Sequence, residues 1–344
     1  MAMYRGVALA AGVMFCASVS AASVTTADRA AAAAAVVQGD PDCTGLTPFY
    51  WEIGDANGLL ASGQGGTAIQ GASKTFTATS VMPIASASKW VAATLMVEQA
   101  QGQVTPEMHQ LLTMSGGYTN FSRCSSTTTV GACLAEPGID GGANGDRNDA
   151  YIGAFYYGSG HMQVLGDRLG YGGYDVNGLA DVIKQLPNTK RGLLYTTPEL
   201  AGGMGVSING YTQFLRNLIS GAYSYMKPLL GSDPVCTTPN NPNCPSAVFS
   251  PINNSRAGGP NNISDERWHY SLGHWVEDDP TVGDGAFSSP GKFGFYPWVD
   301  ASKSWYGVIA RNDVVNVYST DPKKQPYVTS VACGRKMRAA WLHP

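Results

Sequence analysis

A serine and a lysine three positions apart are the residues of this chain whose spacing points most directly to chemistry. Ser86 and Lys89 lie in the stretch Pro83–Gln99, which is typical of a helix from Ala87 onward. Residues three apart share a helix face, so the hydroxyl and the amine are neighbours. A serine becomes a nucleophile when a base takes its proton, and burial or the positive end of a helix favours the neutral amine that can act as this base. The same spacing also fits an N-cap serine beside a solvated lysine, so other segments must decide.

The composition bounds the partners of the chain. It has 344 residues, 44% hydrophobic and 14% charged, with a formal net charge of −3. This length is enough for one large or two ordinary domains with a substantial core. Mild acidity without blocks of Lys or Arg argues against nucleic acid as a partner.

The N-terminus predicts export. Met1–Arg5 is a short positive segment, Gly6–Val19 is apolar but too short to cross a bilayer, and small residues follow, so residues 1–22 are predicted to be a signal peptide. Cys16 follows Phe15, a context that does not indicate a lipid anchor, and we expect no stable membrane anchor. The protein is therefore expected to be secreted or periplasmic. The Ala-rich residues 23–40 are predicted to be a mobile lead-in.

The cysteines indicate disulfides. Six follow the predicted signal peptide: Cys43, Cys124, Cys133, Cys236, Cys244 and Cys333. An even number in an exported chain is typical of a disulfide set. The spacing favours the local pairs Cys124–Cys133 and Cys236–Cys244, which leaves Cys43–Cys333 to join the chain ends, although six cysteines allow 15 pairings.

A metal site is not expected. The chain has no C-x-x-C motif, and His269 and His274 lack the spacing of a usual metal site. Both histidines are more typical of packing or surface positions.

Strand patterns occur at both ends of the chain, with helices and loops between them. The hairpin signal Asp55–Gly58 joins two early strands. The predicted strands are Thr47–Gly54, Leu59–Gly63, Tyr270–Val276, Phe293–Asp300 and Ser304–Ala310, and a terminal helix spans Val328–Leu342. The sequence therefore predicts an α+β fold with one antiparallel sheet built from residues 41–82 and 265–344 and flanked by terminal helices. A mostly helical domain, residues 83–264, is inserted between them; its residues 233–264 are predicted to be a Pro/Asn-rich loop.

Further segments carry motif-like residues in a fixed order: Ser86-Ala87-Ser88-Lys89, Leu111–Gly117, Tyr157-Gly158-Ser159 with Leu165-Gly166, Thr197–Ser207 and Ser289–Gly294. Together they resemble the motifs of the serine β-lactamase and penicillin-binding-protein superfamily, most closely its class C-like branch. That branch includes family VIII-type esterases, D-aminopeptidases and nylon-oligomer hydrolases. The resemblance covers roughly residues 48–335 and implies a β-lactamase/transpeptidase-like fold.

The resemblance implies roles for individual residues. Ser86 would be the nucleophile that forms an acyl-enzyme, Lys89 its base, and Tyr157 the residue that carries the proton to the leaving group and helps to activate water. Tyr156 is the rival of Tyr157, and the spacing to Gly166 favours Tyr157.

The resemblance also implies the groups around the reacting carbonyl. The backbone N–H groups of Ser86 and Lys292 would form the oxyanion hole, with Gly291 inside the third motif. Such acyl-enzyme chemistry needs no metal or cofactor.

Two positions depart from the family pattern. Ser159 stands where the family usually has Asn, and Ser289 stands where β-lactamases and peptidases carry Lys or His. Pro290 also removes a backbone N–H there. Because Ser159 and Ser289 lie at substrate-contacting positions of the motifs, a different substrate class is expected. Lys292 offers a neighbouring charge, although on a strand it would face the other way.

The sequence therefore predicts an exported serine hydrolase that cleaves a small-molecule or oligomer ester or amide. One alternative is a β-lactamase or D-Ala-type peptidase, and another is a non-catalytic cell-wall or ligand-binding module. The α/β-hydrolase alternative lacks its G-x-S-x-G signature, and neither His161 nor His269 has an identifiable serine partner. Nothing in the sequence indicates the oligomeric state.

Overall fold

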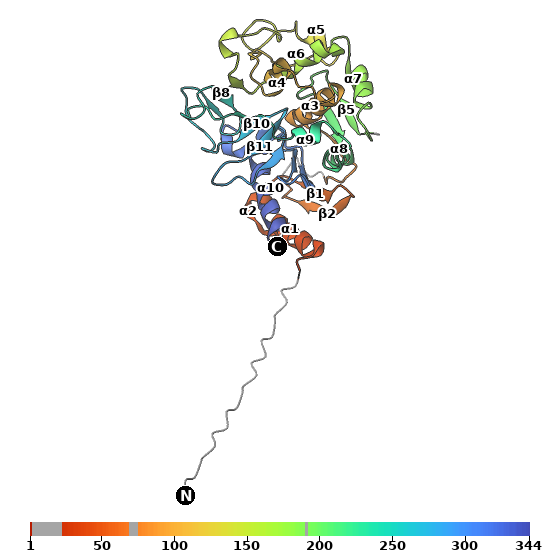
Figure 1. Cartoon of the computed structure of the whole chain (residues 1–344), viewed down its shortest axis with the longest axis vertical. Helices are drawn as coiled ribbons and strands as arrows, with labels where there is room; N and C mark the ends of the chain where they lie inside the picture. The colour runs from red at the N-terminus through yellow and green to blue at the C-terminus, as the bar shows by residue number, and fades with distance from the viewer. Residues whose placement is uncertain (2–22, 69–74, 190–191) are drawn as a thin grey trace.

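The computed structural model describes Met1 and residues 23–68, 75–189 and 192–344 (Figure 1). Residues 2–22 of the predicted signal peptide lie outside the described residues. Within the described part of the chain, no helix is both long and apolar enough to cross a membrane.

An eight-stranded antiparallel sheet joins the two ends of the chain, in the order β2-β1-β14-β13-β12-β11-β10-β7. The strands β1, near the N-terminus, and β14, near the C-terminus, are antiparallel neighbours. In their register, Trp51 pairs with Ile309. The strands are β1 (Phe49–Asp55), β2 (Leu59–Gly65), β7 (Val235–Cys236), β10 (His269–Ser271), β11 (His274–Glu277), β12 (Ala286–Ser288), β13 (Tyr296–Val299) and β14 (Trp305–Ala310). This antiparallel sheet with separate helices confirms the α+β class.

The sheet corrects one predicted strand. Tyr270–Val276 was expected to be continuous, but it forms the hairpin β10–β11, in which Tyr270 pairs with Trp275. Gly273 has φ of +73°, a left-handed conformation that suits glycine and reverses the chain there. The strand β7 comes from within the segment predicted as the inserted domain. The division of the chain into domains stays a prediction.

Two terminal helices pack together beside the sheet, at the end of the molecule where the C-terminus lies (Figure 1). They are α1 (Thr26–Gly39) and α10 (Pro326–Leu342), and the short α2 (Pro41–Thr44) lies against both. The prediction of a mobile lead-in at residues 23–40 is therefore wrong. Alanine has the highest helix propensity, and Thr25 and Asp28 form a capping box at the start of α1.

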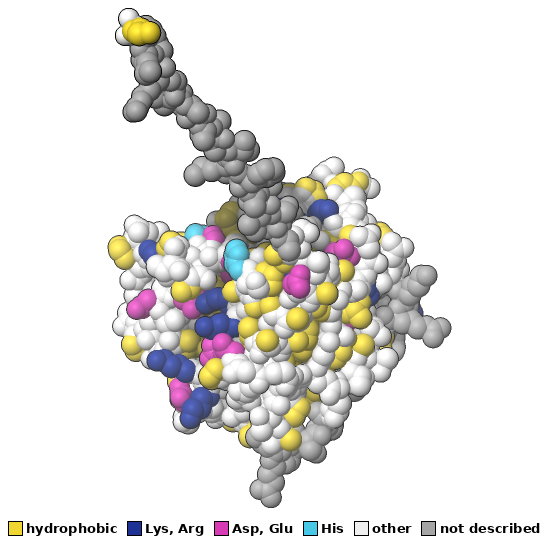
Figure 2. Space-filling view, turned by 90° about the horizontal axis from the view of Figure 1, so that it is seen from below, with side chains coloured by type: hydrophobic (Ala, Val, Ile, Leu, Met, Phe, Trp, Pro, Cys, Tyr) yellow, Lys and Arg dark blue, Asp and Glu magenta, His cyan; other side chains and the backbone are white. Residues whose placement is uncertain are grey.

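On the face seen in Figure 2, acidic and basic side chains lie close together beside a group of apolar ones.

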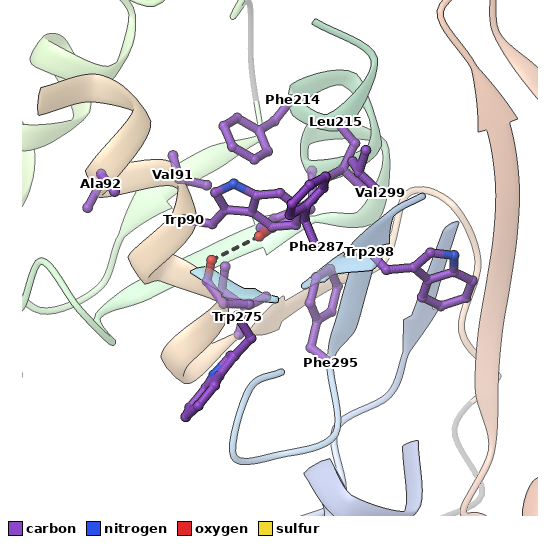
Figure 3. Packing of buried hydrophobic residues seen from close by; sticks show 14 of the residues in the cluster. Trp90, Val91, Ala92, Phe214, Leu215, Trp275, Phe287, Phe295, Trp298 and Val299 are labelled. Atoms are coloured by element: carbon purple, nitrogen blue, oxygen red, sulfur yellow. Dashed lines mark hydrogen bonds between the residues drawn. The ribbon is translucent and has the colours of Figure 1, made fainter. Parts of the chain in front are cut away.

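The helices of the middle segment lie largely at the opposite end of the molecule (Figure 1). They are α3 (Ser88–Gln99), α4 (Pro106–Leu112), α5 (Val130–Cys133), α6 (Gly160–Gly166), α7 (Val176–Ile183), α8 (Ile208–Ser220) and α9 (Met226–Leu229). The core continues from α3 to the large sheet: buried Trp90 contacts Phe214 edge to face (Figure 3). Trp90 also stacks on His274 of β11. This packing fixes α3, the helix that begins beside Ser86.

Two small sheets bring distant segments to the start of α3. In the sheet β3-β6-β5, the strand β3 (Val81–Pro83) runs into Ser86 and pairs with β6 (Met204–Ser207), which also pairs with β5 (Leu193–Tyr195). In the sheet β4-β8-β9, the strand β4 (Phe155–Tyr156) ends directly before Tyr157.

The second small sheet corrects the predicted loop 233–264. That segment contains β7 and also β8 (Ala247–Ser250) and β9 (Ser255–Arg256). Because β8 pairs with β4, residues after Ala247 lie next to Tyr157. The edge of a candidate site is therefore built from a segment predicted to be loop.

All three disulfides that the spacing favoured are present: Cys43–Cys333, Cys124–Cys133 and Cys236–Cys244. The first joins α2 to α10 across 290 positions of sequence. The other two close short loops. The disulfide prediction is confirmed.

Candidate active site

Ser86 and Lys89 lie together at the start of α3. Ser86 belongs to a short 3₁₀ turn, Ala85–Ala87, that leads directly into the helix. Lys89 Nζ lies 3.1 Å from Ser86 Oγ and 3.1 Å from the carbonyl oxygen of Ala201, to which it donates. Only 2% of Lys89 is exposed, so its amine is shielded from water while Ser86 stays partly accessible. The structure therefore brings the two side chains together, as the spacing predicted.

The backbone around Ser86 is held in an uncommon conformation. Ala85 has φ of +45°, a left-handed conformation that costs free energy for a residue with a Cβ. Neighbouring bonds maintain it: Ser88 Oγ accepts from the amide of Met204 at 3.2 Å, and the Tyr211 hydroxyl donates to the carbonyl of Ala87 at 2.9 Å. Backbone strain of this kind concentrates at functional sites.

Tyr157 lies beside this pair. Lys89 Nζ is 4.7 Å from the centroid of the Tyr157 ring, and that ring stacks on Trp275 at 5.3 Å. Within the described residues, the Tyr157 hydroxyl has no hydrogen-bond partner. The rival Tyr156 is engaged elsewhere, because its hydroxyl accepts from Arg256. The structure therefore places Tyr157, and not Tyr156, next to Lys89.

The third motif contacts the backbone of Ser86. Ser289 Oγ donates to the carbonyl of Ser86 at 3.0 Å. Gly291 leaves no room for a side chain, since a Cβ there would lie 2.1 Å from the carbonyl oxygen of Ile84.

Lys292 follows Gly291 in a turn between β12 and β13, and the prediction that it might lie on a strand is wrong. The turn is closed by a bond from the Gly294 amide to the carbonyl of Gly291 at 2.8 Å. Lys292 is exposed, and the described part of the chain provides no acceptor for its backbone N–H. Its backbone therefore remains available to a ligand.

A cavity of about 510 Å³ opens over these groups. Three of the residues predicted for the site, Ser86, Tyr157 and Lys292, line it. The other lining residues are all apolar or uncharged: Phe249, Pro251, Ile252, Asn254, Trp275, Pro290, Val317, Ser319, Thr320, Pro322, Gln325 and Tyr327. This volume and lining are typical of a pocket for a small organic molecule.

Ser159 does not line this cavity. Its hydroxyl donates to Oε1 of Glu199 at 2.9 Å, a residue that the sequence reasoning did not single out. Burial raises the pKa of Glu199, while the nearby positive charge of Lys89 and the bond from Ser159 act in the opposite direction. The sequence feature that could have indicated Glu199 is its position as a lone carboxylate inside the motif-like segment Thr197–Ser207.

Within the described residues, no histidine side chain is hydrogen-bonded to a serine. His161 and His274 are fully buried, and burial lowers the pKa of each to about 4. His269 lies in an ion pair with Asp278 at the surface. The described residues contain no group of three or more His, Cys, Asp or Glu side chains placed to hold a metal ion.

Comparison with protein-family models finds no match for this chain, and comparison with curated proteins finds none either. Solved structures do match. A β-lactamase from Mycobacterium bovis is 13% identical, with a TM-score of 0.51, over 84% of this chain and 95% of that one. The D-amino acid amidase from Ochrobactrum anthropi SV3 complexed with D-phenylalanine is 12% identical, with a TM-score of 0.58, over 91% and 99% of the two chains.

A third structure, EstCE1, described as a hydrolase with promiscuous acyltransferase activity, is 12% identical, with a TM-score of 0.55, over 90% of this chain and 99% of that one. At such identities the similarity shows the fold. The resemblance to the serine β-lactamase and penicillin-binding-protein superfamily is thereby confirmed at the level of the fold.

Proposed function

We propose that this protein is an exported serine hydrolase that cleaves an ester or amide through an acyl-enzyme on Ser86. One observation carries the proposal: a buried lysine amine lies 3.1 Å from a partly accessible serine hydroxyl at the edge of a cavity. A surface lysine beside an N-cap serine would not be 2% exposed. The three disulfides and the predicted signal peptide support export.

The proposed reaction has two steps. Ser86 Oγ attacks the carbonyl carbon while its proton passes to Lys89 Nζ, and the backbone N–H groups of Ser86 and Lys292 bind the developing oxyanion. The bond to the leaving alcohol or amine then breaks as Tyr157 donates its proton to that group, and the Lys89 ammonium passes its proton to Tyr157, which restores both residues. In the second step water attacks the acyl carbon while its proton passes through Tyr157 to Lys89, and that proton returns to Ser86 Oγ as the bond to the acid breaks.

The cavity supports an apolar substrate. Phe249, Ile252, Trp275 and Tyr327 provide apolar surface, which favours a hydrocarbon or aromatic group over a strongly charged one. Ser289, which replaces the cation of β-lactamases, is directed at the Ser86 carbonyl. A penicillin carboxylate would therefore lack its usual partner at that position.

Lys292 supports the second candidate, a β-lactamase or D-Ala-type peptidase. Its exposed side chain at the cavity could pair with a substrate carboxylate. The structural neighbours include a β-lactamase, an amidase and a hydrolase with acyltransferase activity, so acyl transfer from a carbonyl is common to both candidates. The third candidate function, a non-catalytic binding module, is tested by the same experiment.

The test is hydrolysis by the purified mature protein of short p-nitrophenyl esters, nitrocefin and a D-alanyl amide. Ser86→Ala removes the nucleophile, and Ser122→Ala changes an exposed serine as a matched control. Ester turnover that is lost in Ser86→Ala and kept in Ser122→Ala is the expected result. Rapid nitrocefin turnover would favour the second candidate, and no turnover of any substrate would favour a binding module.

A further inference from the structure

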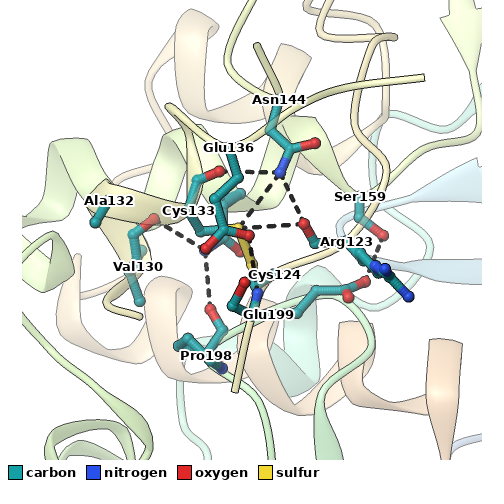
Figure 4. Close-up of a disulfide and its surroundings, with 12 residues drawn as sticks. Arg123, Cys124, Val130, Ala132, Cys133, Glu136, Asn144, Ser159, Pro198 and Glu199 are labelled. Atoms are coloured by element: carbon teal, nitrogen blue, oxygen red, sulfur yellow. Dashed lines mark hydrogen bonds between the residues drawn. A yellow bond between two sulfur atoms is a disulfide. The ribbon is translucent and has the colours of Figure 1, made fainter. Parts of the chain in front are cut away.

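The Ser159–Glu199 pair lies next to the proposed catalytic lysine and has no role in the reaction described above. Figure 4 shows both side chains near the Cys124–Cys133 disulfide, with their hydrogen bond of 2.9 Å drawn. Ser159 follows Tyr157 by two positions, and Glu199 precedes Ala201 by two. Since Tyr157 and the Ala201 carbonyl both contact Lys89, the pair connects the two segments that surround the amine.

The backbone on both sides of Glu199 is fixed by one buried side chain. Gln163 Nε2 donates to the carbonyl of Pro198 at 2.8 Å, and Gln163 Oε1 accepts from the amide of Leu200 at 3.1 Å. Gln163 Nε2 also donates to the carbonyl of Val130 in α5, at 3.0 Å. Gln163 is fully buried, so Glu199 is held by the fold and does not move with an exposed loop.

Two titratable groups interact with the Glu199 carboxylate: the cation Lys89 in α3 and the buried Tyr195 in β5. Two more, Tyr157 and the buried His161 in α6, lie near Lys89. Burial lowers the pKa of His161 to about 4 and raises that of Tyr195, so both are neutral near pH 7. Among these groups, Lys89 is therefore the one whose positive charge acts on the Glu199 carboxylate.

We propose that Glu199, held by Ser159, is a positioning residue that provides the counter-charge of Lys89 and sets the pH at which Lys89 activates Ser86. This inference rests on the proposed function. It also explains why Ser is accepted where the family usually has Asn: the Ser159 hydroxyl donates to the Glu199 carboxylate, on which the charge of Lys89 acts. Because a nearby carboxylate favours the ammonium form of a lysine, Glu199 would delay the formation of the free base as pH rises.

The test uses the rate of covalent labelling by a fluorophosphonate, measured from pH 5 to pH 9 on the full mature protein. Glu199→Gln keeps the shape and removes the charge, so the acidic limb of the rate profile should move to lower pH by about one unit. Ser159→Ala should lower the plateau rate about tenfold, because the Tyr157 segment loses its link to Glu199. Ser159→Thr, which keeps the hydroxyl, should restore the rate.

The control is Asp181→Asn, which removes one carboxylate from an exposed ion pair with Lys184 on α7. The inference would be overturned if the pH profile of Glu199→Gln coincided with that of the wild type. It would also be overturned if Asp181→Asn shifted the profile by an equal amount. In both cases, labelling of the wild type would still uphold the proposed function. Absence of labelling in the wild type would overturn both. If Glu199→Gln fails to fold, the comparison of Ser159→Ala with Ser159→Thr decides, and equal plateau rates overturn the inference.

Discussion

Gly291→Ala should impair the reaction by moving the backbone next to the nucleophile. A Cβ at this position would lie 2.1 Å from the carbonyl oxygen of Ile84 and 3.1 Å from its carbonyl carbon. Carbon–oxygen contacts settle at about 3.3 Å, so that carbonyl must retreat by roughly 1 Å. Ile84 is two residues before Ser86 and accepts a hydrogen bond from the Ala87 amide. The displacement therefore reaches the amide and hydroxyl of Ser86 directly.

The magnitude follows from the size of this movement. A misplacement of about 1 Å at a reacting centre costs on the order of 100-fold in rate, which corresponds to about 2.7 kcal/mol in the activation free energy. Overpacking of a buried position costs about 1–3 kcal/mol in folding stability. We therefore expect kcat to fall about 100-fold in a protein that still folds.

The assay is kcat for a p-nitrophenyl ester, with a urea unfolding curve to show that the variant is folded under assay conditions. Gly173→Ala is the matched control, because a Cβ there meets no atom within 4 Å, and it should retain wild-type kcat. A folded Gly291→Ala protein with at least half of the wild-type kcat would refute the reasoning.

Two predictions concern stability. Because burial lowers the pKa of His161 and of His274 to about 4, against about 6.5 in the unfolded chain, the unfolded state binds more protons between these values. Stability should be fully present above pH 6.5 and fall as pH drops toward 4, by up to roughly 3 kcal/mol per histidine; equal urea unfolding free energies at pH 7 and pH 4.5 would contradict this. The Cys43–Cys333 disulfide spans 290 positions and Cys236–Cys244 spans 8, so replacing both cysteines by serine should cost about 3 kcal/mol more for the first pair. Equal losses in thermal or urea unfolding would show that loop length does not set their contribution.

The parts of the site that depend on short sequence distances could be predicted from the sequence. Ser86 and Lys89 are one helical turn apart, so the local helix pattern already places them together. The two local disulfides are likewise set by their short spacing, and Cys43–Cys333 follows by elimination within the favoured pairing. Tyr157 was indicated by its motif and its distance from Gly166.

Contacts between distant segments could not be predicted in this way. Glu199 meets Ser159 across 40 positions, and Phe249 reaches the cavity because β8 pairs with β4. Nothing in the local pattern of either residue encodes this pairing. The Lys292 position was also missed, because a Gly-Lys-Phe-Gly turn and an alternating strand have similar patterns over so few residues.

Local choices that tertiary packing decides were also missed. The alternation of Tyr270–Val276 fits one strand, but Gly273 reverses the chain and makes two. The Ala-rich residues 23–40 have little amphipathic pattern, yet they form α1 because α10 provides a surface to pack against. Alanine propensity and the capping box favour helix formation in this segment, and the packing of α1 against α10 stabilises the helix.

If Lys89 takes the proton of Ser86, this serine should form a covalent adduct with a fluorophosphonate. Mass spectrometry of the intact protein and of its peptides after this reaction locates the adduct. We predict one adduct, located on Ser86, that is absent in Ser86→Ala and forms at least about 100-fold more slowly in Lys89→Met, as expected when a general base is removed. A wild-type protein that forms no adduct, or an adduct at another serine that persists in Ser86→Ala, would contradict the account.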